Sequence, residues 1–142
     1  MQRPAATLGM RHVALNVHDL AACEAFYVGL LGMMEEWRPD PDNLYLTSGN
    51  DNLALHRVAG HVPAASGQRL DHIGFFVATA GQVDEWHEFL KEHNVAIIAA
   101  PRTHRDGARS FYCSDPEGTV VQVIHHPPIV TSRDRNRSQA NA

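Results

Sequence analysis

The sequence predicts an α+β protein made of two copies of a βαβββ module, and three internal similarities support this prediction. A short strand-like segment with histidine at its second position occurs at residues 11–17 and again at 71–77. Each segment is followed by a stretch with helical periodicity, and each half then ends in two strand-like segments joined by a turn. A repeat of this length indicates a repeated folding unit. We expect the modules to pack about a pseudo-twofold axis, as a curled mixed sheet around a central metal cavity with the helices outside.

The repeat is clearest in the first strand of each module. Residues 11–17 read Arg-His-Val-Ala-Leu-Asn-Val, and residues 71–77 read Asp-His-Ile-Gly-Phe-Phe-Val. Both segments are short and rich in β-branched or aromatic residues, as is typical of strands. His12 and His72 therefore hold equivalent positions, 60 residues apart.

A helix is predicted after each of these strands. The first should begin at Asp19, a good N-cap residue, and end at Gly32, where a left-handed closing residue is expected. The second should begin at Thr79, with Gln82 completing a capping box, and should close at Asn94. The apolar positions expected to face the core are Ala22, Phe26 and Leu30 in the first helix and Val83, Trp86 and Leu90 in the second.

Each module should end in a hairpin, at residues 45–56 and 111–122. Asp115-Pro116-Glu117-Gly118 has the composition of a type I turn. The Arg-rich residues 101–110 predict a loop or flap. We expect one domain, 1–142, in which module one covers about 9–60 and module two about 70–126, with a linker at 60–69 and a mobile tail at 127–142.

Composition excludes several classes of function. The chain is 44% hydrophobic and 20% charged, with a formal net charge of -4 and scattered basic residues, which argues against nucleic acid as a partner. No apolar run is long enough to span a membrane, and the N-terminus lacks the apolar core of a secretory signal. The two cysteines, Cys23 and Cys113, are expected to be free thiols in a reducing cytoplasm.

Equivalent positions of the two modules carry side chains that can bind a metal. His12 corresponds to His72, and the sequence pattern pairs His56 with Gln122. Imidazole and amide oxygen suit Fe, Mn, Co, Ni or Zn, and twofold packing would bring equivalent residues together. These four residues are the expected metal ligands. A single strand histidine is more often an ordinary core or surface residue, so this expectation depends on the repeat.

Over about residues 9–126 the sequence resembles the vicinal oxygen chelate superfamily. This superfamily includes glyoxalase I, extradiol ring-cleavage dioxygenases, fosfomycin-resistance transferases and bleomycin-binding proteins. The resemblance is specific because several short motifs occur together. They are His12 to Val17 followed by Asp19-Leu20, Phe26-Tyr27, Leu31-Gly32, Asp71-His72-Ile73-Gly74 and Asp115-Pro116-Glu117-Gly118.

The extradiol dioxygenases look most similar within the superfamily, and the resemblance implies a role for each candidate residue. His12 and His72 match two histidine ligands of Fe(II), and Gln122 matches the third ligand, which is a glutamate in those enzymes. His56 matches an acid/base histidine. Tyr112 and His104 match residues that steady oxygen intermediates. The implied function is ring cleavage of a small substrate that binds the metal through two oxygens.

Two alternatives remain open. A glyoxalase-type lyase or isomerase would use four ligands, with His56 as the second, but it needs a carboxylate at the last position. Gln122 cannot replace that base, because an amide has no useful basicity near pH 7. A non-catalytic binding protein, like the bleomycin-resistance proteins, would keep the fold without the reaction. The retained histidines and Tyr112 favour an enzyme, whereas Gln122 favours a binder.

An uncharged ligand at position 122 has consequences for the metal and the substrate. Gln122 leaves the full charge on a divalent ion, so affinity should fall and Lewis acidity should rise. The expected ion is Fe(II) first, then Mn, Zn, Ni or Co. An anionic chelating substrate such as a catecholate or enediolate is favoured, with Asn16 and Arg109 as candidate contacts. The resemblance also implies a homodimer that binds a small molecule.

Overall fold

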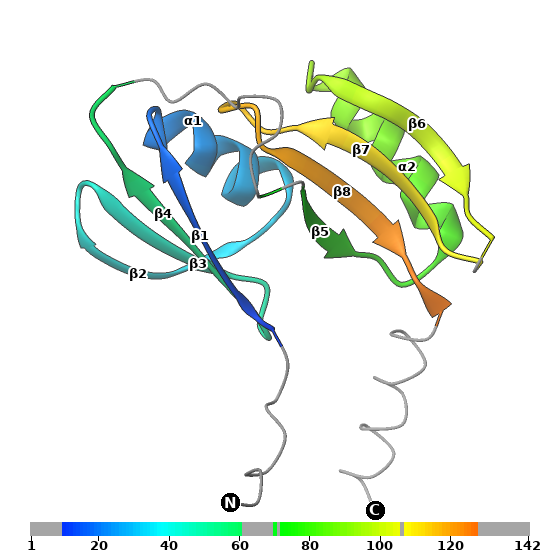
Figure 1. Ribbon diagram of the computed structural model, residues 1–142, viewed down its shortest axis with the longest axis horizontal. Coiled ribbons are helices and arrows are strands. Elements are labelled where there is room, and N and C mark those ends of the chain that lie inside the picture. The colour runs from blue at the N-terminus through cyan, green and yellow to red at the C-terminus, as the bar shows by residue number, and fades with distance from the viewer. Residues whose placement is uncertain (1–9, 61–69, 71, 106, 128–142) are drawn as a thin grey trace, which may run out of the picture. The chain divides into compact units, whose positions relative to one another are not determined.

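The computed structural model describes residues 10–60, 70, 72–105 and 107–127, and the chain divides into two compact units between residues 62 and 63. Each unit contains one four-stranded sheet and its own helical segment (Figure 1). The linker expected at 60–69 and the tail expected at 127–142 lie, apart from Gly60 and Pro127, outside the described residues. No helix in the described ranges has the length and apolar character needed to cross a bilayer.

The first unit has the element order βαβββ. Its strands are β1 (His12–Val17), β2 (Met34–Asp40), β3 (Asn43–Thr47) and β4 (Asn52–Arg57), and its helical segment is α1 (Leu20–Glu24) continued by η1 (Ala25–Leu30). The sheet order is β1-β4-β3-β2, in which β1 and β4 are parallel and the other pairs are antiparallel.

The second unit repeats this topology. Its elements are β5 (Ile73–Phe76), α2 (Ala80–Glu92), β6 (Ile97–Thr103), β7 (Arg109–Ser114) and β8 (Val120–His125). The sheet order is β5-β8-β7-β6, again with one parallel pair, β5 and β8. The prediction of an α+β fold with two βαβββ modules is therefore confirmed. The two sheets are separate and neither closes on itself, in place of one continuous curled sheet.

Local sequence signals account for where the helices begin and end. The Asp19 carboxylate accepts a hydrogen bond from the backbone N–H of Ala22 at 2.9 Å. Thr79 and Gln82 form the predicted capping box. Gly32 and Asn94 both have positive φ, 77° and 59°, as expected of residues that close a helix.

The first helix differs from the prediction in its second half. Residues 25–30 form a π-helical turn, in which the N–H of Leu31 bonds to the carbonyl oxygen of Phe26 at 3.0 Å. The wider turn places Phe26 and the next residue, Tyr27, in the core together, at 3% and 0% exposure. Two adjacent aromatic side chains rarely point the same way from a regular α-helix, so the apolar spacing alone did not reveal this turn.

Each unit has a core between its helix and one face of its sheet. Alternate residues of the core-forming strands β1, β3, β4, β7 and β8 face the helix. Each large apolar side chain that is fully buried contributes about 1.5–3 kcal/mol relative to an exposed one. In the first unit these residues include Leu15, Val17, Leu44, Leu46, Leu53 and Leu55, and in the second they include Val83, Leu90, Phe111, Val121 and Val123.

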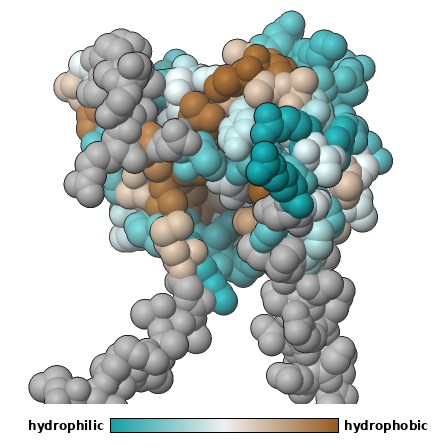
Figure 2. Space-filling view, turned by 45° about the vertical axis from the view of Figure 1, so that its right-hand side comes forward, coloured by the Kyte–Doolittle hydropathy of each residue, from teal (hydrophilic) through white to brown (hydrophobic). Residues whose placement is uncertain are grey.

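One expectation about an irregular segment was wrong. Residues 101–110 do not form one loop or flap, because Pro101 to Thr103 extend β6 and β7 begins at Arg109. Trp37 is 58% exposed and lies on β2 with its ring 5.2 Å from that of Tyr45. Figure 2 shows apolar residues, in brown, at the surface beside polar ones.

Candidate functional site

Most of the predicted site residues lie on one face of their own sheet. We call the face that is turned away from the unit's helix the open face. In β1 the helix-facing residues Leu15 and Val17 are buried, whereas His12 and Asn16 are exposed on the open face. The open face of the second sheet is marked in the same way by Tyr112 and Gln122, which alternate with the buried Phe111, Cys113, Val121 and Val123.

The strand registers correct one equivalence expected from the sequence. In the first sheet Ala14 pairs with Ala54, and in the second Gly74 pairs with Gln122. If His12 corresponds to His72, then Ala14 corresponds to Gly74, and Ala54 is the counterpart of Gln122. His56 pairs with Asn16, so its counterpart is Ile124, the partner of Phe76. Spacing along one strand could not reveal this, because pairing between distant strands sets the register.

His12 is connected to a carboxylate through an amide on the open face of the first sheet. Its Nδ1 lies 2.6 Å from Oδ1 of Asn52, its register partner on β4. Nδ2 of Asn52 donates to Oε2 of Glu36 on β2 at 2.7 Å. The three side chains also line an open hollow of about 720 Å³. His12 is thereby held at one end of a hydrogen-bonded chain that crosses the sheet.

His56 has the same kind of connection at the other end of β4. Its Nδ1 lies 2.5 Å from Oδ1 of Asn43, and Nδ2 of Asn43 donates to both carboxylate oxygens of Asp40 at 2.9 Å. The hydrogen bond from Asn43 is the main reason that the pKa of Asp40 lies below its usual value. Asn16 is the register partner of His56, and the ring of Tyr45 packs edge-on against His56 at 5.8 Å.

Gln122 is the centre of a polar network on the second sheet. Its Nε2 donates to the hydroxyl oxygens of Tyr112 and Ser110, each at 2.9 Å. Oγ of Ser110 also lies 2.9 Å from Nε2 of His104. Ser110 is 1% exposed and Gln122 8% exposed, so these bonds satisfy polar groups that water barely reaches. The network joins three predicted site residues, Gln122, Tyr112 and His104.

His72 lies beside this network, immediately before β5. Its ring packs edge-on against that of Tyr112, with 5.4 Å between the ring centroids. Nε2 of Gln122 donates to residues of β7, so the other atom of the amide, Oε1, points toward β5. Oε1 lies close to Gly74 of that strand: a Cβ added to the glycine would be 3.7 Å from the oxygen. The second unit therefore brings His72, Tyr112, Gln122 and His104 together on one open face.

Arg109 is not part of this group. It alternates with Ser110 along β7 and faces the helix, where its guanidinium donates to both carboxylate oxygens of Asp84 at 2.5 and 3.0 Å. This bidentate bond holds the pKa of Asp84 below its usual value and raises the pKa of Arg109. The arginine expected to contact substrate thus has an internal partner on the opposite face of its sheet.

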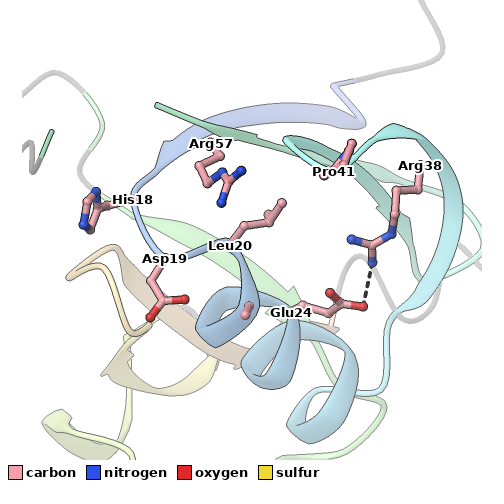
Figure 3. Close-up of a pocket in the computed structure, with 8 residues that line it drawn as sticks. His18, Asp19, Leu20, Glu24, Arg38, Pro41 and Arg57 are labelled. Carbon is pink, nitrogen blue, oxygen red and sulfur yellow. Dashed lines mark hydrogen bonds and ion pairs between the residues drawn. The ribbon is translucent and has the colours of Figure 1, made fainter. Parts of the chain in front are cut away.

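A separate hollow of about 300 Å³ lies on the helix side of the first sheet (Figure 3). Its lining is charged, but the charges are balanced: Arg38 binds Glu24 at 2.6 Å, and Nε of Arg57 donates to Asp42 at 2.6 Å. Glu35 and Glu24 together raise the pKa of Arg38. None of the predicted site residues lines this hollow.

Sequence reasoning missed the residues that orient the candidate histidines. Asn43 and Asn52 lie in strands, where asparagine is depleted, and each bonds to both a histidine and a carboxylate. Ser110, which connects Gln122 to His104, was also missed. The available signal was the unusual polarity of alternate positions in strands whose other positions are apolar. Within the residues described, no group of three or more His, Cys, Asp or Glu side chains could hold a metal.

The fold and its motifs match known proteins. Three similar solved structures are lactoylglutathione lyase from Agrobacterium tumefaciens (21% identity, 85% of this chain and 96% of that one, TM-score 0.69), a glyoxalase/bleomycin resistance protein/dioxygenase from Alicyclobacillus acidocaldarius (20%, 84% and 92%, 0.66) and the fosfomycin resistance protein FosX from Listeria monocytogenes (19%, 84% and 94%, 0.68). At these identities the likeness concerns the fold alone. No curated protein sequence matches the chain.

A family model matches most of the chain. It is described as the Glyoxalase/Bleomycin resistance protein/Dioxygenase superfamily and covers residues 9–123. This range includes the whole first βαβββ unit, the second unit as far as the middle of β8, and every predicted site residue. The repeated topology and the motifs at the start of β1, before β5 and in the turn before β8 lie within that range. The chain belongs to this superfamily.

Proposed function

We propose that the protein binds a divalent metal through His12, His72 and Gln122 and uses it to hold a small substrate with two neighbouring oxygens. An extradiol-type dioxygenase is the reaction that we favour. The observation that carries this proposal is the network on the second sheet. Beside His72, hydrogen bonds join Tyr112 to Gln122, Gln122 to Ser110, and Ser110 to His104.

The donors in each unit suit a divalent ion. Nδ1 of His12 is engaged by Asn52, so Nε2 is the nitrogen that can coordinate. Gln122 uses its nitrogen on Tyr112 and Ser110, which leaves its carbonyl oxygen as the donor.

The register favours three protein ligands over the four of a glyoxalase-type site. The counterpart of Gln122 in the first unit is Ala54, whose methyl group cannot bind a metal. His56 lies two residues further along β4, where its Nδ1 bonds to Asn43. We therefore propose that His56 transfers a proton at Nε2 and that His12, His72 and Gln122 are the metal ligands.

A bound ion would supply Lewis acidity, which makes a chelating hydroxyl easier to deprotonate. His56 would accept that proton at Nε2, with its ring held by Asn43. Tyr112 would donate its hydroxyl hydrogen to an oxygen of the substrate, because the Tyr112 oxygen accepts from Gln122. His104 would hold Ser110, and through it the orientation of the Gln122 amide. A catecholate or enediolate is the substrate class that these roles fit.

The assembly and location of the protein are further parts of the proposal. Trp37 and Phe76 are 58% and 47% exposed on the open faces of their sheets, which supports association of two chains into a homodimer. Cys23 and Cys113 are free and buried, which fits a reducing cytoplasm.

Metal analysis tests the proposal directly. Protein purified without chelator, or reconstituted with Fe(II) under argon, should contain one metal ion per chain, as measured by inductively coupled plasma mass spectrometry. His12→Ala and His72→Ala should each lose it. His93→Ala is the matched control, because His93 lies at the end of α2 and bonds to the backbone oxygen of Phe89.

Activity then separates the reactions. A screen of catechols should show oxygen uptake with the Fe(II) protein, and His56→Ala should reduce the rate at least 100-fold, in line with the loss of a general base. Turnover of 2-oxoaldehyde adducts without oxygen uptake would instead identify a lyase. A folded protein that stays metal-free after reconstitution and still binds a ligand would overturn the enzyme proposal in favour of a binding protein.

A further inference from the structure

The first sheet treats its two open-face histidines alike. His12 and His56 lie at opposite ends of the β1–β4 pair, and Nδ1 of each approaches the side-chain oxygen of an asparagine, at 2.6 and 2.5 Å. Each asparagine then donates through Nδ2 to a carboxylate, Glu36 in one case and Asp40 in the other. The same sequence of groups, imidazole to amide to carboxylate, is therefore built twice.

The carboxylate decides the direction of each chain of hydrogen bonds. An ionised carboxylate only accepts, so the amide must turn its NH2 toward it and its carbonyl oxygen toward the imidazole. A carbonyl oxygen cannot donate, so the ring nitrogen that faces it must carry a hydrogen. Nδ1 of His12 and Nδ1 of His56 are therefore the donors, and in the neutral ring Nε2 keeps its lone pair.

We propose that Asn52 with Glu36, and Asn43 with Asp40, are positioning pairs that hold His12 and His56 in the Nδ1–H tautomer and so present Nε2 as a ligand or base on the open face. The proposal deepens the function proposed above and rests on it for the use that Nε2 serves. Histidine in water favours the Nε2–H tautomer, so the preference of the free side chain is reversed.

A β-bulge delivers Glu36 to its place. Glu35 pairs with Leu46 and Trp37 with Tyr45, so Glu36 is the extra residue between two consecutive register pairs. Its neighbour Glu35 bonds to Arg38 beside Glu24 of the helix, whereas Glu36 reaches Asn52. Bulges commonly re-aim a side chain in this way. Without the extra residue, Glu36 itself would stand opposite Tyr45, the position that Trp37 now takes.

The second unit shows that the bulge alone does not require an acid. Ile97 pairs with Cys113 and Ala99 with Tyr112, so the same bulge occurs in β6 with Ile98 as its extra residue. Ile98 is 54% exposed and offers no polar group. The bulge is therefore common to both units. A carboxylate occupies it in the first unit, where Glu36 bonds to Asn52 beside His12.

The tautomers can be measured without any metal. Long-range 1H–15N spectra of 15N-histidine-labelled, metal-free protein, recorded where the rings are neutral, should show His12 and His56 as Nδ1–H, with assignments from His12→Gln and His56→Gln. In Glu36→Gln the neutral side chain can donate as well as accept, so the Asn52 amide can turn over and His12 should shift toward Nε2–H. His56 should not change. In Asp40→Asn, His56 should shift toward Nε2–H and His12 should not change.

Metal affinity provides the second readout. With Zn²⁺ alone as the probe, Glu36→Gln should weaken binding 10- to 100-fold, the usual effect of losing a group that orients a ligand. Glu35→Gln is the matched control, since it removes the same charge one residue away on the helix side; it should leave both the tautomer and the affinity unchanged.

The outcomes separate this inference from the proposed function. An Nε2–H tautomer for His12 in the unaltered protein, or an unchanged tautomer in Glu36→Gln, would overturn the inference even if the protein binds Zn²⁺ well. Protein that binds no metal but has both rings as Nδ1–H would support the positioning pairs and remove the proposed metal function.

Discussion

Gln122 donates a hydrogen bond through Nε2 to the hydroxyl oxygen of Tyr112, 2.9 Å away. The same nitrogen donates to Ser110, so both hydrogens of the amide are donated to hydroxyl oxygens of β7. The Tyr112 oxygen is an acceptor in this bond, which leaves its own hydrogen for another partner. A carboxylate at position 122 would reverse the arrangement, because it could only accept that hydrogen.

Gln122→Glu should therefore change two properties at once. The added charge should raise the affinity for a divalent ion at least tenfold, or about 1.4 kcal/mol, because a negative ligand attracts the ion more strongly than a neutral one. Zn²⁺ titration by calorimetry measures this change. The hydroxyl of Tyr112 should turn toward the new carboxylate, so its hydrogen is no longer offered to a ligand oxygen. A catechol should therefore bind the metal-free variant more weakly than it binds the metal-free unaltered protein.

Gln82→Glu is the matched control for this substitution. It adds the same charge at the start of α2, where glutamate serves the capping box as well as glutamine does. Its Zn²⁺ affinity should equal that of the unaltered protein. Equal affinities for Gln122→Glu and Gln82→Glu would show that residue 122 is not a ligand.

The local features of the fold could be predicted from the sequence because short-range chemistry determines them. Asp19 and Thr79 cap their helices, Gly32 and Asn94 close them, and Gly118 donates its N–H to the carbonyl oxygen of Asp115 at 3.1 Å in the predicted turn. Each of these depends on residues within about four positions of one another.

Features that depend on pairing between distant strands were not accessible in the same way. The counterpart of Gln122 is Ala54 and not His56, because the β1–β4 and β5–β8 registers decide it. The bulge at Glu36 and the helix-facing direction of Arg109 depend on the partner strand and on strand parity. The sequence identified the histidines as candidate site residues. The asparagine–carboxylate pairs beside them could be recognised only in the structure, because their members come from different strands.

Leu90→Ala should destabilise the second unit by about 2–5 kcal/mol, because Leu90 is fully buried and the smaller side chain leaves a cavity. Urea unfolding followed by circular dichroism gives the change in free energy. Ile98→Ala removes a comparable apolar side chain that is 54% exposed, and should change the free energy of unfolding by no more than about 0.5 kcal/mol. Equal effects of the two substitutions would contradict the packing of α2 against its sheet.

Thr79→Ala should cost about 1 kcal/mol, since the backbone N–H of Gln82 loses its acceptor at the start of α2. Thr79→Ser keeps the hydroxyl and should recover most of the loss. Thermal unfolding of the three proteins at one pH measures both effects. If serine destabilised as much as alanine, the hydroxyl would not be the stabilising group.

The thiol of Cys113 should be unreactive in the folded protein. Burial, followed by the nearby charge of Asp115, raises its pKa to about 12, and the side chain is 0% exposed. Iodoacetamide at pH 8 should leave Cys113 unmodified by mass spectrometry, whereas 6 M urea should expose it to rapid alkylation. Modification of the native protein at the rate of a free cysteine would show that β7 opens readily.

The bond between Asp84 and Arg109 should make the stability of the second unit depend on pH. Arg109 lowers the pKa of Asp84 in the folded state, so the bond stabilises the protein at pH values above the ordinary carboxyl pKa of about 3.9. This stabilisation is lost as the pH falls through the lowered value. Asp84→Asn should therefore reduce the Tm at pH 7, and the difference from the unaltered protein should shrink as the pH approaches 3.

Glu85→Gln provides the control for that experiment, because it removes the same charge at the next, exposed position of α2. Its effect on the Tm should be smaller at pH 7, since the guanidinium of Arg109 is bound to Asp84 by two hydrogen bonds. A loss of Tm in Asp84→Asn that is as large at pH 3 as at pH 7 would mean that the side chain stabilises α2 by packing and not by its charge. The double variant Asp84→Asn with Arg109→Gln should then behave additively, whereas a true ion pair makes the second substitution cost less than it does alone.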